Sequence, residues 1–245
     1  MFKKMALTAS LLAVTSSIAF SAGLPDPGVT FTQGNTAIVI TDPQNDFLSP
    51  EGVTWSLVGK NVTANKTVEN IEKLFKIADK KDIPVFVSPH YYYPHDHQWE
   101  HGGALEKAMH GMGMFDRSGP LDTSEFEGSG ADWLEAYKPY INNGRTVVTS
   151  PHKVYGPESN DMVLQLRKRG IDKIILAGMS ANLCTESHMR EFMEQGFEVQ
   201  IVSDATAAAQ LPGMDAYQAA MVNFRMISNA VRTTEETLAQ INQEL

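Results

Sequence analysis

Short, continuous apolar runs alternate with longer segments of helical periodicity along most of the chain. The apolar runs have the composition of strands buried on both faces, and they cover residues 36–41, 84–88, 146–149, 173–178 and 198–203. Apolar residues recur every three or four positions over residues 68–81, 162–166, 183–195, 216–228 and 234–243. Strands that alternate with helices in this way are typical of right-handed βαβ units. The pattern predicts an α/β fold: a Rossmann-like three-layer sandwich with a mostly parallel central sheet and helices on both faces.

Two segments fall outside this alternation. Residues 91–143 contain no clear strand and are rich in His, Met, Gly and aromatic residues, so we interpret them as an insertion or lid. At the N-terminus, two lysines precede an apolar run over residues 5–20, which is too short and too rich in Thr and Ser for a membrane span. Residues 19–21 fit a small-x-small cleavage pattern. We therefore predict a signal peptide at residues 1–21, a single domain at residues 22–245, and a periplasmic or secreted protein that has no membrane attachment after cleavage.

Charge and cysteine content narrow the possible functions. The chain has 20 Lys and Arg against 29 Asp and Glu, a formal net charge of −9, and its longest basic cluster is residues 167–169. A nucleic-acid partner would require a basic face, so this composition argues against one. The chain has one cysteine, which excludes an intrachain disulfide and a multi-cysteine metal site. An unpaired thiol is unusual in an exported protein, and this raises the prospect that the thiol has a chemical role.

Three reactive side chains follow predicted strands. Asp42 follows the first strand, Lys153 the third, and Cys184 the fourth, at the start of a predicted helix. In parallel sheets, ligands bind beyond the carboxyl ends of the strands. A helix start and an ammonium group favour a thiolate, and a carboxylate can accept a proton and return it. Taken one at a time, Asp42 could cap a loop, Lys153 could be a solvated lysine, and Cys184 could be a small apolar core residue. Together they predict a cysteine acyl-transfer site.

The motifs around these residues resemble a known family. Residues 41–47 (TDPQNDF), Lys153 and residues 177–187 (AGMSANLCTES) are similar to the three signatures of the isochorismatase-like cysteine hydrolases. Residues 202–205 and 233–236 are similar to that family too, so the resemblance covers about residues 36–240. It implies a catalytic triad of Asp42, Lys153 and Cys184.

The resemblance implies further features of the site. It implies a non-proline cis peptide bond between Met179 and Ser180, and an oxyanion hole formed by the backbone amides of Ser180 and Cys184. Members of the family include nicotinamidases and N-carbamoyl amidohydrolases. We therefore expect an exported enzyme that cleaves a C–N bond of a small amide, ureide or carbamoyl compound through a thioester. The resemblance implies a small-molecule substrate, no cofactor, and a homo-oligomer, either a dimer or a tetramer.

The segment after the second strand departs from the family pattern. Nicotinamidases carry an Asp-x-His-Pro metal motif there, whereas this chain has three tyrosines, residues 91–93, before Pro94. Six possible ligands lie nearby without a fixed ligand spacing: His90, His95, Asp96, His97, His101 and His110. We interpret this segment as a polar lid or pocket wall and predict no metal. The residues that we expect to line the substrate pocket are Phe47, His90, Trp99 and Tyr155.

Two alternative functions remain open from the sequence. One is an isochorismatase-type ether hydrolase, although such enzymes commonly lack the cysteine. The other is a non-catalytic exported protein that binds a small molecule. A nucleotide-binding Rossmann protein is excluded because residues 42–44, which follow the first strand, form no glycine-rich turn. Thiol alkylation separates an enzyme from a binding protein, because a catalytic thiolate reacts fast at neutral pH.

Overall fold

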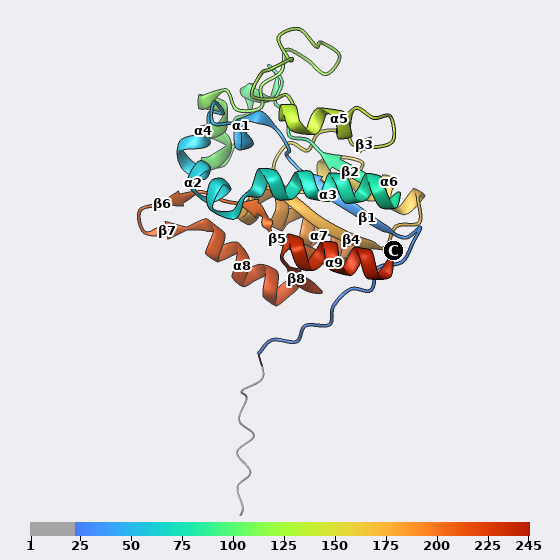
Figure 1. Cartoon of the computed structure of the whole chain (residues 1–245). Coiled ribbons are helices and arrows are strands. Elements are labelled where there is room, and N and C mark those ends of the chain that lie inside the picture. Colours follow the sequence, from blue (N-terminus) through green and yellow to red (C-terminus); the bar gives the residue numbers. More distant parts are fainter. Residues whose placement is uncertain (1–22) are drawn as a thin grey trace, which may run out of the picture.

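Six parallel strands form the central sheet (Figure 1). The computed structural model describes residues 23–245, so the predicted signal peptide lies outside the described residues. The strand order is β3-β2-β1-β4-β5-β8. The strands are β1 (Thr36–Thr41), β2 (Val85–Ser88), β3 (Val147–Val148), β4 (Lys173–Met179), β5 (Glu198–Ala207) and β8 (Ala230–Arg232). A separate antiparallel hairpin consists of β6 (Gln210–Leu211) and β7 (Met214–Asp215).

Helices cover both faces of the sheet. On one face, α2 (Trp55–Asn65), α3 (Thr67–Lys81), α5 (Lys138–Ile141) and α9 (Thr234–Glu244) contribute to one apolar core. On the other face, α6 (Met162–Lys168), α7 (Glu186–Glu194) and α8 (Ala216–Ile227) contribute to a second core. Short helices complete the chain: α1 (Asn45–Leu48), η1 (Asp96–Gln98), α4 (Ala104–Met112), η2 (Glu135–Tyr137), η3 (Pro157–Ser159) and η4 (Ala181–Thr185). The predicted three-layer α/β fold is confirmed.

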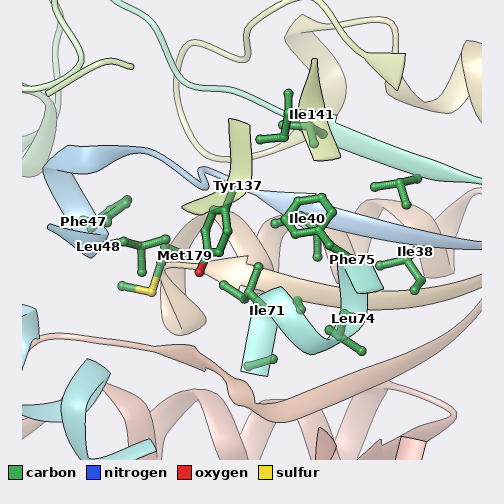
Figure 2. Packing of buried hydrophobic residues seen from close by; sticks show 14 of the residues in the cluster. Ile38, Ile40, Phe47, Leu48, Ile71, Leu74, Phe75, Tyr137, Ile141 and Met179 are labelled. Atoms are coloured by element: carbon green, nitrogen blue, oxygen red, sulfur yellow. The ribbon is translucent and has the colours of Figure 1, made fainter. Parts of the chain in front are cut away.

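Strand β1 supplies both cores because its side chains alternate between the faces. Ile38 and Ile40 belong to the first core, and the residues before each of them, 37 and 39, belong to the second. Figure 2 shows Ile38 and Ile40 beside Leu74 and Phe75 of α3. A strand that is buried on both faces must be apolar at every position, which explains why the sequence shows continuous apolar runs.

Several elements were not predicted. Helix α2 lies between the first predicted strand and the first predicted helix, and it was missed because its buried side includes Gly59 and Asn61 and its apolar periodicity is weak. The Asn61 side chain accepts a hydrogen bond from the backbone amide of Ala208 (2.9 Å). Strand β8 has three residues and follows a polar stretch, so its short apolar run is not visible as a strand.

The predicted lid at residues 91–143 contains short helices and no named strand within the described residues. It is fixed to the loop after β1. The Asp46 carboxylate accepts the backbone N–H of Phe115 (2.7 Å), and the Gln44 side-chain amide donates to the carbonyl of Ala131 (2.9 Å). Nowhere in residues 23–245 does a helix combine the length and the apolar character needed to cross a membrane.

Candidate active site

Four adjacent strands deliver four reactive side chains to one edge of the sheet. Asp42 directly follows β1, His90 follows β2, His152 follows β3, and Cys184 follows β4. The backbones of His90 and His152 lie side by side in a parallel bridge beyond β2 and β3. One potential donor atom of each of the four residues lies within 4.8 Å of the others, and all four residues are buried. Asp42 and Cys184 therefore meet as predicted, and they are joined by two histidines that the predicted triad does not include.

Close packing of β4 on β1 positions the thiol. Gly178 pairs with Thr41, and a Cβ at Gly178 would lie 2.1 Å from the Thr41 carbonyl oxygen. The chain then passes through a cis peptide bond between Met179 and Ser180, as expected, and enters η4, which carries Cys184. The hydroxyl groups of Thr41 and Thr185 are hydrogen-bonded (3.0 Å), so η4 is tied to the end of β1.

The thiol of Cys184 is buried beside the Asp42 carboxylate. Its side chain is 2% exposed. Burial and the neighbouring Asp42 carboxylate raise the pKa of the thiol well above its usual value, while the backbone amides of Ser180 and Cys184 act in the opposite direction. These two amides are the groups that the family resemblance implies for the oxyanion hole. The arrangement requires a proton acceptor for the thiol, and Asp42 is the carboxylate beside it.

The partner of Asp42 is His152. The imidazole Nε2 of His152 donates to Asp42 Oδ1 (2.7 Å), and both side chains are 0% exposed. The Asp42 backbone has a φ of +45°. This left-handed conformation is uncommon outside glycine, although aspartate tolerates it better than most residues.

Lys153 was predicted to be the cation of the triad, and the contacts of its ammonium group are with the lid. Its ammonium donates to the Tyr91 carbonyl (2.9 Å) and to Asp96 (2.5 Å), and it lies 3.7 Å from the centre of the Tyr93 ring. Successive side chains of an extended segment point to opposite sides. Because His152 faces Asp42, Lys153 faces the lid.

Two further histidines, His90 and His188, lie near the site, and His188 contacts the thiol segment. The backbone amide of His90, predicted as a pocket residue, donates to Gln44 (2.9 Å), and burial lowers the pKa of the His90 imidazole well below its usual value. His188 was not predicted. Its Nδ1 donates to the Cys184 carbonyl (2.7 Å), its Nε2 accepts from the Ser88 hydroxyl (2.8 Å), and burial lowers its pKa to about 3. Its position one helical turn after Cys184 was the available signal.

The other predicted pocket residues have different surroundings. Phe47 is 5% exposed and packs edge-on against Phe115 in the core, with ring centres 5.3 Å apart. Trp99 packs against the ring of Tyr92 inside the lid (5.8 Å). Tyr155 is half-buried, and burial together with the charges of Glu106 and Cys184 raises its pKa to about 12. Of these three residues, Phe47 belongs to the core and Trp99 to the packing of the lid, while Tyr155 is half-buried in the loop after β3.

Curated proteins are similar to this chain in sequence. The chain is 27% identical to ureidoacrylate amidohydrolase RutB of Acinetobacter baylyi over 223 residues, which cover 86% of each protein. Three curated relatives match over shorter regions, which span 26%, 57% and 47% of their lengths.

Solved structures show the same fold. A cysteine hydrolase from Pseudomonas syringae pv. phaseolicola superimposes with a TM-score of 0.72 at 20% identity, covering 92% of this chain and 100% of that one. N-carbamoylsarcosine amidase from Thermoplasma acidophilum superimposes with a TM-score of 0.58 at 18% identity, covering 82% and 97%. Residues 36–236 match the isochorismatase domain. The chain therefore belongs to the isochorismatase family.

Proposed function

We propose that the chain hydrolyses a C–N bond of a small amide, ureide or carbamoyl compound, with Cys184 as the nucleophile and Asp42 as the proton shuttle. Family membership and the similarity to an amidohydrolase along most of the chain support a hydrolase of this type. The observation that carries the proposal is the only thiol of the chain, which lies in the first turn after β4 beside a buried carboxylate.

The proposed reaction has two halves. The thiol proton passes to the Asp42 carboxylate while sulfur attacks the carbonyl carbon, and the amides of Ser180 and Cys184 bind the resulting oxyanion. The C–N bond then breaks, and Asp42 returns the proton to the departing nitrogen. In the second half, water gives a proton to Asp42 and attacks the thioester. The C–S bond breaks, the acid leaves, and sulfur takes the proton back from Asp42.

In this mechanism His152 takes the place beside Asp42 that was predicted for Lys153. Its Nε2–H holds Asp42 Oδ1 (2.7 Å), which leaves Oδ2 free to exchange protons with sulfur and nitrogen. Lys153 is a positioning residue, because it joins the strand-3 loop to the lid through Asp96 and Tyr91.

The function is tested with a panel of primary amides, ureides and carbamoyl compounds scored for ammonia release. We expect turnover of at least one class, and its loss in Cys184→Ala and Asp42→Asn variants whose circular dichroism is unchanged. A slow substrate should leave an acyl mass on the peptide that contains Cys184. Ammonia release that persists in Cys184→Ala would contradict a thioester. Ether cleavage without amide cleavage, or saturable binding without turnover, would favour one of the two alternative functions.

We also propose that the protein is exported. The support is the sequence pattern of residues 1–21, where two lysines precede an apolar run and a small-x-small site. The mass of the native protein should correspond to a chain that begins at Ala22 or Gly23. An intact Met1 on the native protein would contradict export by this signal.

A further inference from the structure

The imidazole of His188 links the residue of the nucleophile to the sheet. His188 lies in α7, one helical turn after Cys184, and is 0% exposed. Its Nδ1 contacts the Cys184 carbonyl oxygen (2.7 Å), and its Nε2 contacts the Ser88 hydroxyl at the end of β2 (2.8 Å). Asn160, in the loop between η3 and α6, contacts the same hydroxyl (2.9 Å). A continuous chain of hydrogen bonds therefore runs from this loop to the backbone of the thiol residue.

The donors and acceptors of this chain follow at every step. The backbone N–H of Met162 donates to Asn160 Oδ1 (2.9 Å), so the Asn160 amide turns its nitrogen toward Ser88 and donates to the hydroxyl oxygen. A carbonyl oxygen only accepts, so Nδ1 of His188 carries the proton that bonds Cys184. Burial lowers the pKa of His188 to about 3, so the ring is neutral and its Nε2 accepts the Ser88 O–H. Both ring nitrogens are thus paired, and one tautomer is fixed.

Two hydroxyl groups of the sheet hold consecutive residues of the thiol segment. Thr41 of β1 pairs in register with Ser88 of β2, so both side chains lie on the same face of the sheet. The Thr41 hydroxyl bonds the Thr185 hydroxyl directly (3.0 Å), while Ser88 reaches Cys184 through His188. The peptide group that joins residues 184 and 185 is therefore held at its carbonyl oxygen and at the side chain that follows it.

The turn that carries the thiol is irregular. In η4 the N–H of Thr185 donates to the Ser180 carbonyl (3.2 Å), which makes a wide turn of the π type. Such a turn interrupts the regular α-helical bonding pattern, and turns of this kind occur mostly at functional sites. The same short segment contains the Cys184 sulfur and the amides of Ser180 and Cys184, which are proposed to bind the oxyanion. A rotation of the Cys184 peptide group would therefore displace the sulfur and an oxyanion donor together.

His188 acts through position and not through charge. Its neutral ring adds no cation beside the thiol, and both of its nitrogens are engaged away from the sulfur. Its ring also packs edge-on against the ring of His152, with ring centres 5.2 Å apart. His152 is the partner of Asp42. One imidazole therefore contacts the residue of the nucleophile and the support of the proton shuttle, and sets the two relative to each other.

We propose that His188 is a positioning residue for the thiol, which holds the Cys184 peptide group through its Nδ1–H while Ser88 holds the imidazole. Because the reaction of the thiol is itself proposed, this role rests on the proposed function. Loss of the Nδ1–H contact leaves a buried carbonyl unpaired, and the peptide group then turns toward another donor. We expect a displaced sulfur that reacts more slowly, while substrate binding changes little.

Two substitutions break opposite halves of the hydrogen-bond chain. In His188→Asn the amide nitrogen is as many bonds from Cα as Nδ1, so it can still donate to Cys184, while the Ser88 contact is lost. In His188→Gln the amide group reaches the position of Nε2, so it keeps Ser88 and loses Cys184. His188→Gln should slow alkylation of Cys184 by iodoacetamide and lower kcat at least about tenfold, with KM within about threefold. His188→Asn should keep both rates within about threefold of the wild type.

The two variants are matched, because each removes the same buried imidazole, and a purely structural role would slow both equally. Equal alkylation rates in the two variants would therefore overturn the role of His188. Alkylation needs no turnover, so failure of the whole substrate panel beside an intact alkylation difference would contradict the proposed function and still support the position assigned to His188.

A second measurement uses the wild type and does not depend on the folding of a variant. In ¹⁵N NMR spectra recorded between about pH 5 and pH 8, the His188 ring should be neutral and protonated at Nδ1. A ring protonated at Nε2, or at both nitrogens, would overturn the proposal, because the contact with the Cys184 carbonyl requires the proton on Nδ1 of a neutral ring.

Discussion

Gly178 sets the distance between the strands that carry Asp42 and Cys184. It pairs with Thr41 and has a φ of +111°. A Cβ at this position would lie 2.1 Å from the Thr41 carbonyl oxygen and 2.4 Å from the Thr41 nitrogen. Both are backbone atoms in the centre of the sheet and cannot rotate away. Gly178→Ala should therefore force β4 and β1 apart, with effects on both stability and the site.

The magnitude follows from two contributions. A non-glycine residue held at this φ costs about 1–3 kcal/mol, and overpacking a close-packed interior costs about 1–3 kcal/mol. We expect Gly178→Ala to lower the free energy of unfolding by roughly 2–6 kcal/mol, a large share of the 5–15 kcal/mol typical of a domain. Relief of the clash to a normal contact separates the strands by about 1 Å. A displacement of that size at reacting groups lowers rates by about 10²-fold.

Urea unfolding followed by circular dichroism measures the stability change, and ammonia release measures the effect on the site. Gly111→Ala is the control, because Gly111 lies in α4 and a Cβ there meets nothing within 4 Å. Replacing a helical glycine by alanine should stabilise by about 0.5–1 kcal/mol. If Gly178→Ala unfolds within about 1 kcal/mol of the wild type and retains its activity, the role assigned to this contact is wrong.

Three further predictions concern the site and its supports. Lys153→Met should act mainly on KM, whereas His152→Ala should lower kcat at least about 10²-fold in steady-state assays; the reverse ranking would restore Lys153 to the triad. Tyr137→Phe removes a hydroxyl bond of 2.9 Å to a carbonyl of α3 and should cost about 0.5–1.5 kcal/mol in urea unfolding; no change would mean that water replaces the bond. Thr233→Ala should cost about 0.5–2 kcal/mol at pH 7. The backbone N–H and the hydroxyl of Thr233 both donate to Glu236 and lower its pKa below the ordinary 4.5. Alanine removes the hydroxyl bond alone, so that share of the stabilisation is present above pH 4.5 and lost as pH falls through the lowered pKa; a difference that stays constant down to pH 2 would contradict this.

The layered fold is readable from the sequence because burial dictates composition. Helices cover both faces of the sheet, so β1 and β4 must be apolar over most of their length and stand out as continuous runs. Helix α2 does not stand out, because its buried side contains Gly59 and Asn61, and the polar Asn61 is satisfied by a contact 147 residues away. Two valines, Val58 and Val62, are its buried apolar residues, which is too few for a clear apolar periodicity.

The same reasoning explains why the sequence brings Asp42 and Cys184 together but does not reveal the two histidines beside them. A residue that directly follows a buried strand, such as Asp42, has its position fixed by the end of that strand. The loop after β3 contains two consecutive candidates, His152 and Lys153. Their side chains point in opposite directions, so a shift of one residue decides which of them faces the site. Lys153 was predicted to belong to the site because an ammonium group can stabilise a thiolate. The residue that is buried against Asp42 is its neighbour, His152. Likewise His90 and His152 are 62 residues apart, and only the order β3-β2-β1-β4 makes them neighbours of the thiol. Local sequence reports which residues end strands, whereas the sheet order that brings those ends together is a property of the whole chain.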